Sequence, residues 1–531
     1  MTVDLALLEK PKPTILGTID DYARASLTRA QLMPSPEFAT RERNHANGRL
    51  THRRPIDPAR RLRPMKRVVD CPAGGPVMRN PIKIRLVRTC CFRAAWALGL
   101  LWAATETCTA QPPSANGWAG RTVVPKARKL PLKDPKNGTE HSGPAAIYHV
   151  TKTNGNSLLL ATTGVAGWAQ VDQVVPVEQA ASYFTTRIQA NPRESFNYTM
   201  RALVSLHQNT EVERSLADLN EAIRLAPRDV DTRLTRAEVW RVKGDAAKAI
   251  DEYSEVIRND PQVLPAYFGR AAIEGEIGEL DKAIADLGSA IRVEPRLPDT
   301  YIVRAAAWNH QGSIDKAIAD LGTAITLDPR NPATYHDRGL LWSRKKDFDK
   351  AIDDYSLAIR LEPGTATGYC SRGFAYKAQK QYDSAIADYS QAVSLDPRDA
   401  DAFCGRGWCW LEKKEYAKSL SDFGQALRID PRDACALDGR AWIGATCPNP
   451  TYRDGKKTVE TAIEACELTR WKEAYCLETL AAGYAETGDF ASAVKWQTKA
   501  IELETDPKEK EEYRARLKLF QEKKPYHETK P

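Results

Sequence analysis

The sequence lacks the short motifs that mark most catalytic and nucleotide-binding sites. It contains no glycine-rich phosphate loop, nucleophile elbow, zinc-protease helix or dinucleotide fingerprint. Its 8 histidines are scattered, and its 11 cysteines include no CxxC pair. No pair of acidic residues is set inside an apolar stretch, as catalysis by two carboxylates requires. We therefore expect a protein that is not an enzyme and that holds no cofactor and no metal.

The sequence also offers no apolar run that would cross a bilayer, which takes about 20 residues. The apolar run at 94–104 has only 11 residues. A basic stretch precedes it and small residues follow it, and these are the parts of a secretory signal. We interpret residues 78–110 as a signal-peptide-like segment behind a disordered or untranslated leader, residues 1–77. If the signal is used, the protein is exported to the periplasm or cell surface; otherwise it is cytoplasmic. The alternative is a segment that stays attached and lies on a membrane surface.

Most of the chain lacks an excess of positive charge. The formal net charge is +8, but the first 110 residues carry 19 Lys and Arg against 9 Asp and Glu. This leaves 58 basic and 60 acidic residues for the rest of the chain. A nucleic-acid partner is favoured by a basic patch or stripe on the folded body. We therefore expect no nucleic-acid partner.

What the sequence does contain is a long internal repeat. Eight prolines recur with one gap of 35 residues and six gaps of 34, at Pro192, Pro227, Pro261, Pro295, Pro329, Pro363, Pro397 and Pro431. A fixed period of this size is typical of a stacked repeat array. Each unit contains two helical patterns joined by a short polar turn, and the proline ends the second helix.

Small and large residues alternate at fixed positions of this repeat, as two closely packed helices require. One small series is Ala202, Ala237, Ala271, Ala305, Gly339, Gly373, Gly407 and Ala441; large residues include Trp240, Trp308, Trp342, Tyr376 and Trp410. This pattern resembles the tetratricopeptide repeat family, whose unit is a 34-residue helix–turn–helix. The resemblance implies a mostly α fold, a right-handed α-solenoid of about eight to nine repeats over residues 178–503. The charged residues 504–531 would form a C-terminal capping helix and tail.

The chain departs from the family pattern at position 7 of the unit, where an arginine replaces the usual aliphatic residue. An acidic residue follows sixteen positions later in most units. We interpret these residues as a structural ladder of internal ion pairs, because a half-buried charge needs a partner. The alternative is a basic stripe for anionic partners. The predicted ladder consists of Arg270, Arg304, Arg338, Arg372 and Arg406 with Asp286, Asp320, Asp354, Asp388 and Asp422.

A small β-rich unit precedes the repeats, at residues 118–177. Asn154-Gly155 between two alternating runs predicts a β-hairpin. The sequence IYHVTKTNGNSLLLATTGVAGWAQVDQVVP, residues 147–176, resembles a bacterial SH3-like barrel. The resemblance implies a small β-barrel that binds peptides or wall polymers, and hence a possible association with the cell wall or a membrane surface.

The family resemblance places the ligand site in the concave groove, which is lined by the first helix of each unit. Residues expected to face this groove become more apolar toward the C-terminus: Phe268, Ile302, Leu340, Phe374, Trp408 and Trp442. We expect a non-enzymatic scaffold or adaptor that binds a protein or peptide segment there. The alternatives are an exported cell-wall or surface binder that uses the SH3-like domain, and a regulatory subunit of an enzyme. Cys404 and Cys435 could face each other across adjacent repeats.

Overall fold

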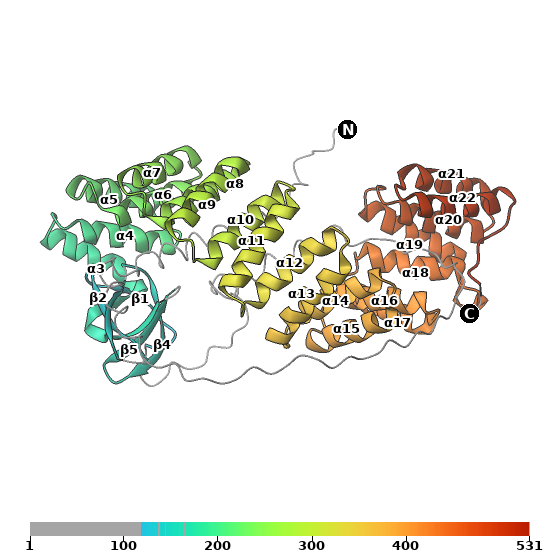
Figure 1. Ribbon diagram of the computed structural model, residues 1–531, viewed down its shortest axis with the longest axis horizontal. Coiled ribbons are helices and arrows are strands. Elements are labelled where there is room, and N and C mark those ends of the chain that lie inside the picture. The colour runs from blue at the N-terminus through green and yellow to red at the C-terminus, as the bar shows by residue number, and fades with distance from the viewer. Residues whose placement is uncertain (1–117, 136–137, 144, 163–164, 530–531) are drawn as a thin grey trace, which may run out of the picture. The chain divides into compact units, whose positions relative to one another are not determined.

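The computed structural model describes residues 118–135, 138–143, 145–162 and 165–529 (Figure 1). The predicted leader, residues 1–77, and the signal-like segment, residues 78–110, lie outside the described residues. The described chain divides into two compact units, residues 118–334 and 335–529. Each unit is described by itself.

The first unit opens with a sheet of seven strands in the order β3-β2-β6-β5-β4-β1-β7, all paired antiparallel. The strands are β1 Thr122–Pro125, β2 Leu130–Lys133, β3 Glu140–Gly143, β4 Tyr148–Asn154, β5 Ser157–Thr162, β6 Val165–Gln170 and β7 Val174–Pro176. The predicted hairpin is present, because β4 and β5 pair up to Asn154 and Ser157, with Gly155 at a φ of 55° in the turn.

The predicted SH3-like barrel is not supported, because these strands form a curled half-barrel. In the described sheet, β3 and β7 are the two edges, and a barrel requires such edges to pair. The strand β7 is only three residues long and leads directly into a helix at Val177. The strands β2 and β3 lie outside the run 147–176 that predicts the β unit; they are four residues each and lie in a stretch rich in Pro and Lys.

The rest of the described chain is helical, with 20 α-helices (Figure 1). Those of the first unit are α3 Val177–Ala190, α4 Ser195–His207, α5 Val212–Leu225, α6 Val230–Lys243, α7 Ala246–Asn259, α8 Leu264–Glu276, α9 Leu280–Val293, α10 Pro298–His310 and α11 Ile314–Leu327. The helix α12, Pro332–Arg344, begins at the boundary between the units. The second unit continues with α13 Phe348–Leu361, α14 Ala366–Ala378, α15 Tyr382–Leu395, α16 Ala400–Glu412, α17 Tyr416–Ile429, α18 Ala434–Thr446, α19 Gly455–Leu468, α20 Ala474–Glu486, α21 Phe490–Leu503 and α22 Pro507–Gln521.

Nine helix pairs, from α4–α5 to α20–α21, make up the repeats. The turn inside most pairs needs one residue in the left-handed region, which glycine adopts without steric cost. Gly244, Gly278 and Gly312 supply it at φ of 83–84°. Lys346, Lys380 and Lys414 take the same place at φ of 62–63°. A left-handed lysine costs about 1–2 kcal/mol in backbone energy, so this turn is held by the helices packed around it.

The core of each repeat lies between its two helices and the first helix of the next pair. In the first unit, Tyr253 of α7 is fully buried in a cluster with Ala237 of α6 and Ile273 of α8. At the start of the array, α3 connects the sheet to the first pair, because Phe184 packs with Val124 of β1 and Phe196 of α4. The sheet and the first repeats therefore share one continuous apolar contact.

The helix α22 covers the last pair in the second unit. It contacts α21 and buries Tyr513 and Phe520, while most of its other side chains are exposed. This is the arrangement that a capping helix requires, since a terminal repeat has no further neighbour to hide its apolar side. In the part of the chain that the structure describes, no helix has both the length and the apolar character needed to cross a membrane.

Candidate functional site

The position-7 arginines bind the acidic side chains sixteen residues later. In five repeats the guanidinium forms two parallel hydrogen bonds with the aspartate, Nε to Oδ2 and Nη2 to Oδ1, at 2.6–2.8 Å. The pairs are Arg270–Asp286, Arg304–Asp320, Arg338–Asp354, Arg372–Asp388 and Arg406–Asp422. The aspartate side chains are 5–10 % exposed and the arginines 19–24 %. Two-point pairing of this kind satisfies both charges inside the repeat.

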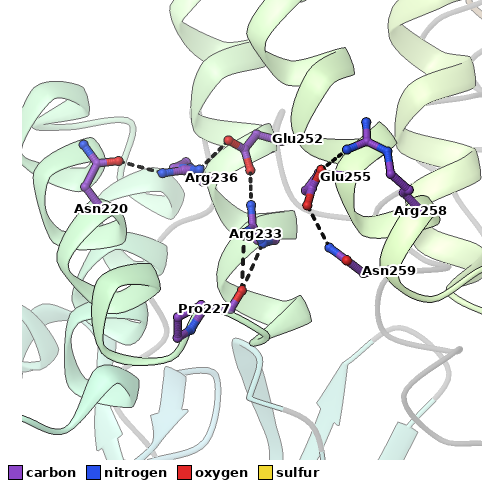
Figure 2. Close-up of polar contacts among 8 residues, drawn as sticks. All are labelled: Asn220, Pro227, Arg233, Arg236, Glu252, Glu255, Arg258 and Asn259. Carbon is purple, nitrogen blue, oxygen red and sulfur yellow. Dashed lines mark hydrogen bonds and ion pairs between the residues drawn. The ribbon is translucent and has the colours of Figure 1, made fainter.

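Several of the position-7 arginines also reach back to the preceding repeat. Figure 2 shows Arg236 of α6 between two helices, with Glu252 of α7 on one side and Asn220 of α5 on the other. Its Nη1–H donates to the amide oxygen of Asn220 at 2.8 Å. In three other repeats a serine hydroxyl sixteen residues earlier accepts this bond at 2.9–3.1 Å: Ser254 from Arg270, Ser356 from Arg372 and Ser390 from Arg406. Each such guanidinium therefore joins three helices across a repeat boundary.

The boundary between α9 and α10 lacks this hydroxyl, because the residue sixteen positions before Arg304 is Gly288. A Cβ atom at Gly288 would lie 3.7 Å from Arg304 Nη1, an ordinary contact distance. We expect Gly288→Ser to raise the unfolding free energy by about 1 kcal/mol, through higher helix propensity and a new hydrogen bond to a charged group. The matched control is Gly288→Ala, which brings the higher helix propensity without the hydroxyl. Thermal and denaturant melts check this, and equal shifts for both variants would contradict the role of Arg304.

The six residues predicted to line the groove are embedded to different degrees. Phe268, Ile302, Trp408 and Trp442 are buried, at 0–7 % exposure, whereas Leu340 and Phe374 are half-buried. The ring of Trp408 packs edge-on against Phe423 at 5.6 Å. The ring of Phe374 packs in the same way against Phe348 at 6.4 Å. Much of their apolar surface is thus used inside the repeats, and their contact with a ligand stays a prediction.

A part of the chain itself lies against the start of α17 and against α18 in the second unit. Residues 523–529, here called the docked segment, follow the end of α22 without regular secondary structure. The carboxylate of Glu528 accepts hydrogen bonds from Tyr416 Oη at 2.9 Å and Trp442 Nε1 at 2.9 Å, and Lys414 Nζ lies 2.6 Å away. Its backbone N–H donates to the carbonyl oxygen of Thr446 at 2.8 Å. With an 8 % exposed side chain, Glu528 is a buried anion with three donors.

The side chains of the docked segment alternate between embedded and exposed. Glu528 is buried and Tyr526 is half-buried, while the residues on either side of each are exposed. The ring of Tyr526 lies 6.0 Å from that of Trp442 and 5.1 Å from the Arg516 guanidinium of α22. His527 reaches outward, to Glu486 at 2.7 Å. This is how an extended peptide presents alternate side chains to a receptor.

The site around Glu528 is electrostatically matched to a carboxylate. Burial, and then the negative charge of Glu528, raises the pKa of Tyr416, so its hydroxyl stays protonated and donates. Lys414 supplies the positive charge that a buried anion requires. No sequence motif singles out Lys414, Tyr416 or Glu528. The one available signal was that Lys414 occupies the turn position where three earlier repeats have glycine.

A second cluster of polar side chains lies in the same unit, on α16 and at the start of α18. The side-chain ligand atoms of Cys404, Asp433 and Cys435 lie within 4.8 Å of one another, and both thiols are free. These are donors that zinc accepts. However, Asp433 Oδ1 already accepts the N–H groups of Cys435 and Ala436 at the start of α18. Burial also raises the pKa of Cys404, which disfavours the thiolate that binds a metal.

The solved structures that are similar to this chain include three proteins, each with a TM-score below 0.5. MamA is 25 % identical, over 32 % of this chain and 93 % of its own, with a TM-score of 0.30. YrrB, a tetratricopeptide repeat protein with an unusual peptide-binding site, is 18 % identical over 35 % of this chain and 95 % of its own, with a TM-score of 0.31. Yeast Tom70 is 14 % identical over 65 % of this chain and 92 % of its own, with a TM-score of 0.34. The chain has no match among curated proteins.

Two segments of the chain match models of the tetratricopeptide repeat family. Residues 204–263 match from α4 to the end of α7, and residues 366–399 match α14 and α15. The first segment lies in the first unit and the second in the second unit. Both contain the paired helices and the arginine–acid contacts described above. The chain therefore contains tetratricopeptide repeats.

Proposed function

We propose that this protein is a non-enzymatic interaction scaffold that binds an extended protein or peptide segment along the first helices of its repeats. The observation that carries the proposal is the docked segment. Residues 523–529, which lie outside the repeats, contact α17 and α18 through the side chains of Tyr526 and Glu528 and one backbone hydrogen bond, and His527 contacts Glu486. The same helices can therefore accept a chain segment that is not part of the repeat.

The position-7 arginines support this proposal because their contacts disfavour an anionic partner. The ladder guanidiniums are engaged by acids and hydroxyls of the repeat, so they are poorly suited to bind an anionic partner such as nucleic acid. The first helices α14, α16 and α18 contact one another in sequence order. A segment laid across them meets a continuous face made by several repeats.

A selection from a phage-displayed peptide library on the purified full chain tests the proposal. We expect peptides selected by the natural chain to bind Phe374→Ala, a half-buried position on α14, at least about tenfold more weakly, a loss of roughly 1.4 kcal/mol. The control is Leu395→Ala, at the end of the second helix α15, where the side chain is 37 % exposed. This variant should bind them unchanged. Failure to select any peptide, or equal losses in both variants with the fold retained, would sink the proposal.

A further inference from the structure

The donors around Glu528 belong to the repeats and form a complete carboxylate site without the docked segment. Lys414 lies in the turn between α16 and α17, Tyr416 begins α17, and Trp442 is on α18. The ammonium, hydroxyl and indole N–H converge on one carboxylate at 2.6–2.9 Å. With the docked segment in place, Tyr416 and Trp442 are buried and Lys414 is half-buried, so their donors need an acceptor, and the positive charge of Lys414 favours an anionic one.

The site also contacts the backbone and an aromatic side chain of the bound segment, which a free carboxylate lacks. The carbonyl oxygen of Thr446 accepts the backbone N–H of the bound glutamate at 2.8 Å. Trp442 and Arg516 hold an aromatic ring two residues earlier in the segment. In an extended chain, residues two apart point to the same side, so both anchors fit one strand-like peptide.

We propose that Lys414, Tyr416 and Trp442 form a binding site for an extended peptide with an aromatic residue two positions before a glutamate, and that Tyr526 and Glu528 of the same chain occupy it in the free protein. This inference rests on the proposed function and names the chemistry of the ligand. A partner peptide of this type binds by displacing the docked segment. The segment is held at few points, since the residues flanking Tyr526 and Glu528 are exposed.

Occupation by the chain's own segment predicts competition. A tethered segment acts at an effective concentration on the order of 1 mM. It therefore weakens the apparent affinity of a peptide with a Kd of ~10 µM by about 100-fold. The probe is a fluorescein-labelled synthetic peptide with the sequence of residues 522–530, measured by fluorescence anisotropy on the full chain. We expect weak binding to the natural chain and binding at least about tenfold tighter to the double variant Tyr526→Ala/Glu528→Ala.

The turn lysines provide a matched pair of variants in that double-variant background. Lys414 and Lys380 lie 34 residues apart with the same φ of 62°, and glycine occupies this turn position in earlier repeats at φ of 83–84°. Both Lys414→Gly and Lys380→Gly therefore suit the backbone and keep the fold. We expect Lys414→Gly to lose at least about tenfold in peptide affinity, because only this lysine lies against the bound carboxylate. Lys380→Gly should have no effect. A peptide with glutamine in place of the glutamate should bind the double variant as weakly as the unaltered peptide binds Lys414→Gly.

Three results would overturn the proposal. The first is that the folded double variant does not bind the labelled peptide. The second is that Lys414→Gly and Lys380→Gly have equal effects. The third is that the natural chain forms a dimer in light scattering that the double variant does not form, which would assign the docked segment to a second copy. The library selection is independent of these results, since peptides of another sequence that depend on Phe374 would leave the proposed function intact.

Discussion

Gly405→Ala is expected to lower the unfolding free energy by about 1–3 kcal/mol, although alanine is the better helix former. A Cβ atom at this position of α16 would lie 2.4 Å from Cζ and 2.6 Å from Cε1 of Tyr389. Tyr389 of α15 is 1 % exposed, so its ring has no free space into which it could move. The added methyl group therefore forces apart the second helix of one repeat and the first helix of the next.

The control for this result is Gly424→Ala in α17 of the same repeat. No atom lies within 4 Å of a Cβ built there, and only the helix propensity changes. We expect this variant to be more stable than the natural chain by roughly 0.5–1 kcal/mol. Denaturant melts of the two variants should thus shift in opposite directions. If both stabilise the chain, the close packing of Gly405 on Tyr389 is not real.

Asp388→Asn should destabilise the second unit by about 3–5 kcal/mol, because it removes the negative charge opposite a largely buried guanidinium. The Asp388 carboxylate accepts from Arg372 Nε at 2.7 Å and from Nη2 at 2.8 Å, and these hydrogen bonds raise the pKa of Arg372. Asparagine keeps the size of the side chain but leaves the cation without a counter-charge. Hydrogen exchange should show the loss concentrated in α14, α15 and α16, since repeats depend most on their neighbours.

An exposed ion pair of the same unit serves for comparison. Glu415 and Lys418 lie 3.4 Å apart and are about half exposed, so Glu415→Gln should change stability by less than about 0.5 kcal/mol. The double replacement Arg372→Met/Asp388→Leu should recover much of the stability lost in Asp388→Asn, because it leaves no unpaired charge. Equal losses of unfolding free energy in Asp388→Asn and Glu415→Gln would show that the Arg–Asp ladder does not stabilise the fold.

The repeat fold was predictable from the sequence because its signals are periodic. Prolines, small residues and aromatic residues recur every 34 positions, so each unit independently predicts the same helix pair. The close approach of the helices at Gly407 illustrates this, since a Cβ there would lie 2.8 Å from the ring of Phe423. Periodicity says nothing about residues outside the repeat, and the sheet was accordingly predicted less well than the helices.

Position 6 of the unit, the residue before the position-7 arginine, carries a different sequence signal for close helix packing. Position 6 varies from repeat to repeat and has no consensus of its own. Its residue is small, however, where the residue sixteen positions earlier is aromatic: Gly269 after Tyr253, Ser371 after Tyr355, Gly405 after Tyr389 and Gly439 after Phe423. Where that earlier residue is leucine, position 6 is larger, as in Val303 after Leu287. Matching of volumes across the repeat boundary explains the variation.

The docked segment could not have been predicted in this way. Its contacts to Lys414, Tyr416 and Trp442 join residues 86 to 114 positions apart, and they occur once in the chain. A single buried glutamate near the end of the sequence resembles any other charged residue until the fold brings the three donors together. The predicted groove residues had the opposite difficulty, because an apolar side chain on a first helix serves the core as readily as a ligand.

The missing hydroxyl at Gly288 has a consequence for the response of the protein to mechanical force. When a repeat array is stretched, the load passes through each boundary in series, and the least reinforced boundary separates first. In the first unit, Arg236 and Arg270 fasten their boundaries to the preceding helix through Asn220 and Ser254, whereas Arg304 meets a glycine. Tension on this unit should therefore open it between α9 and α10, releasing whole helix pairs on either side rather than unravelling it from one end.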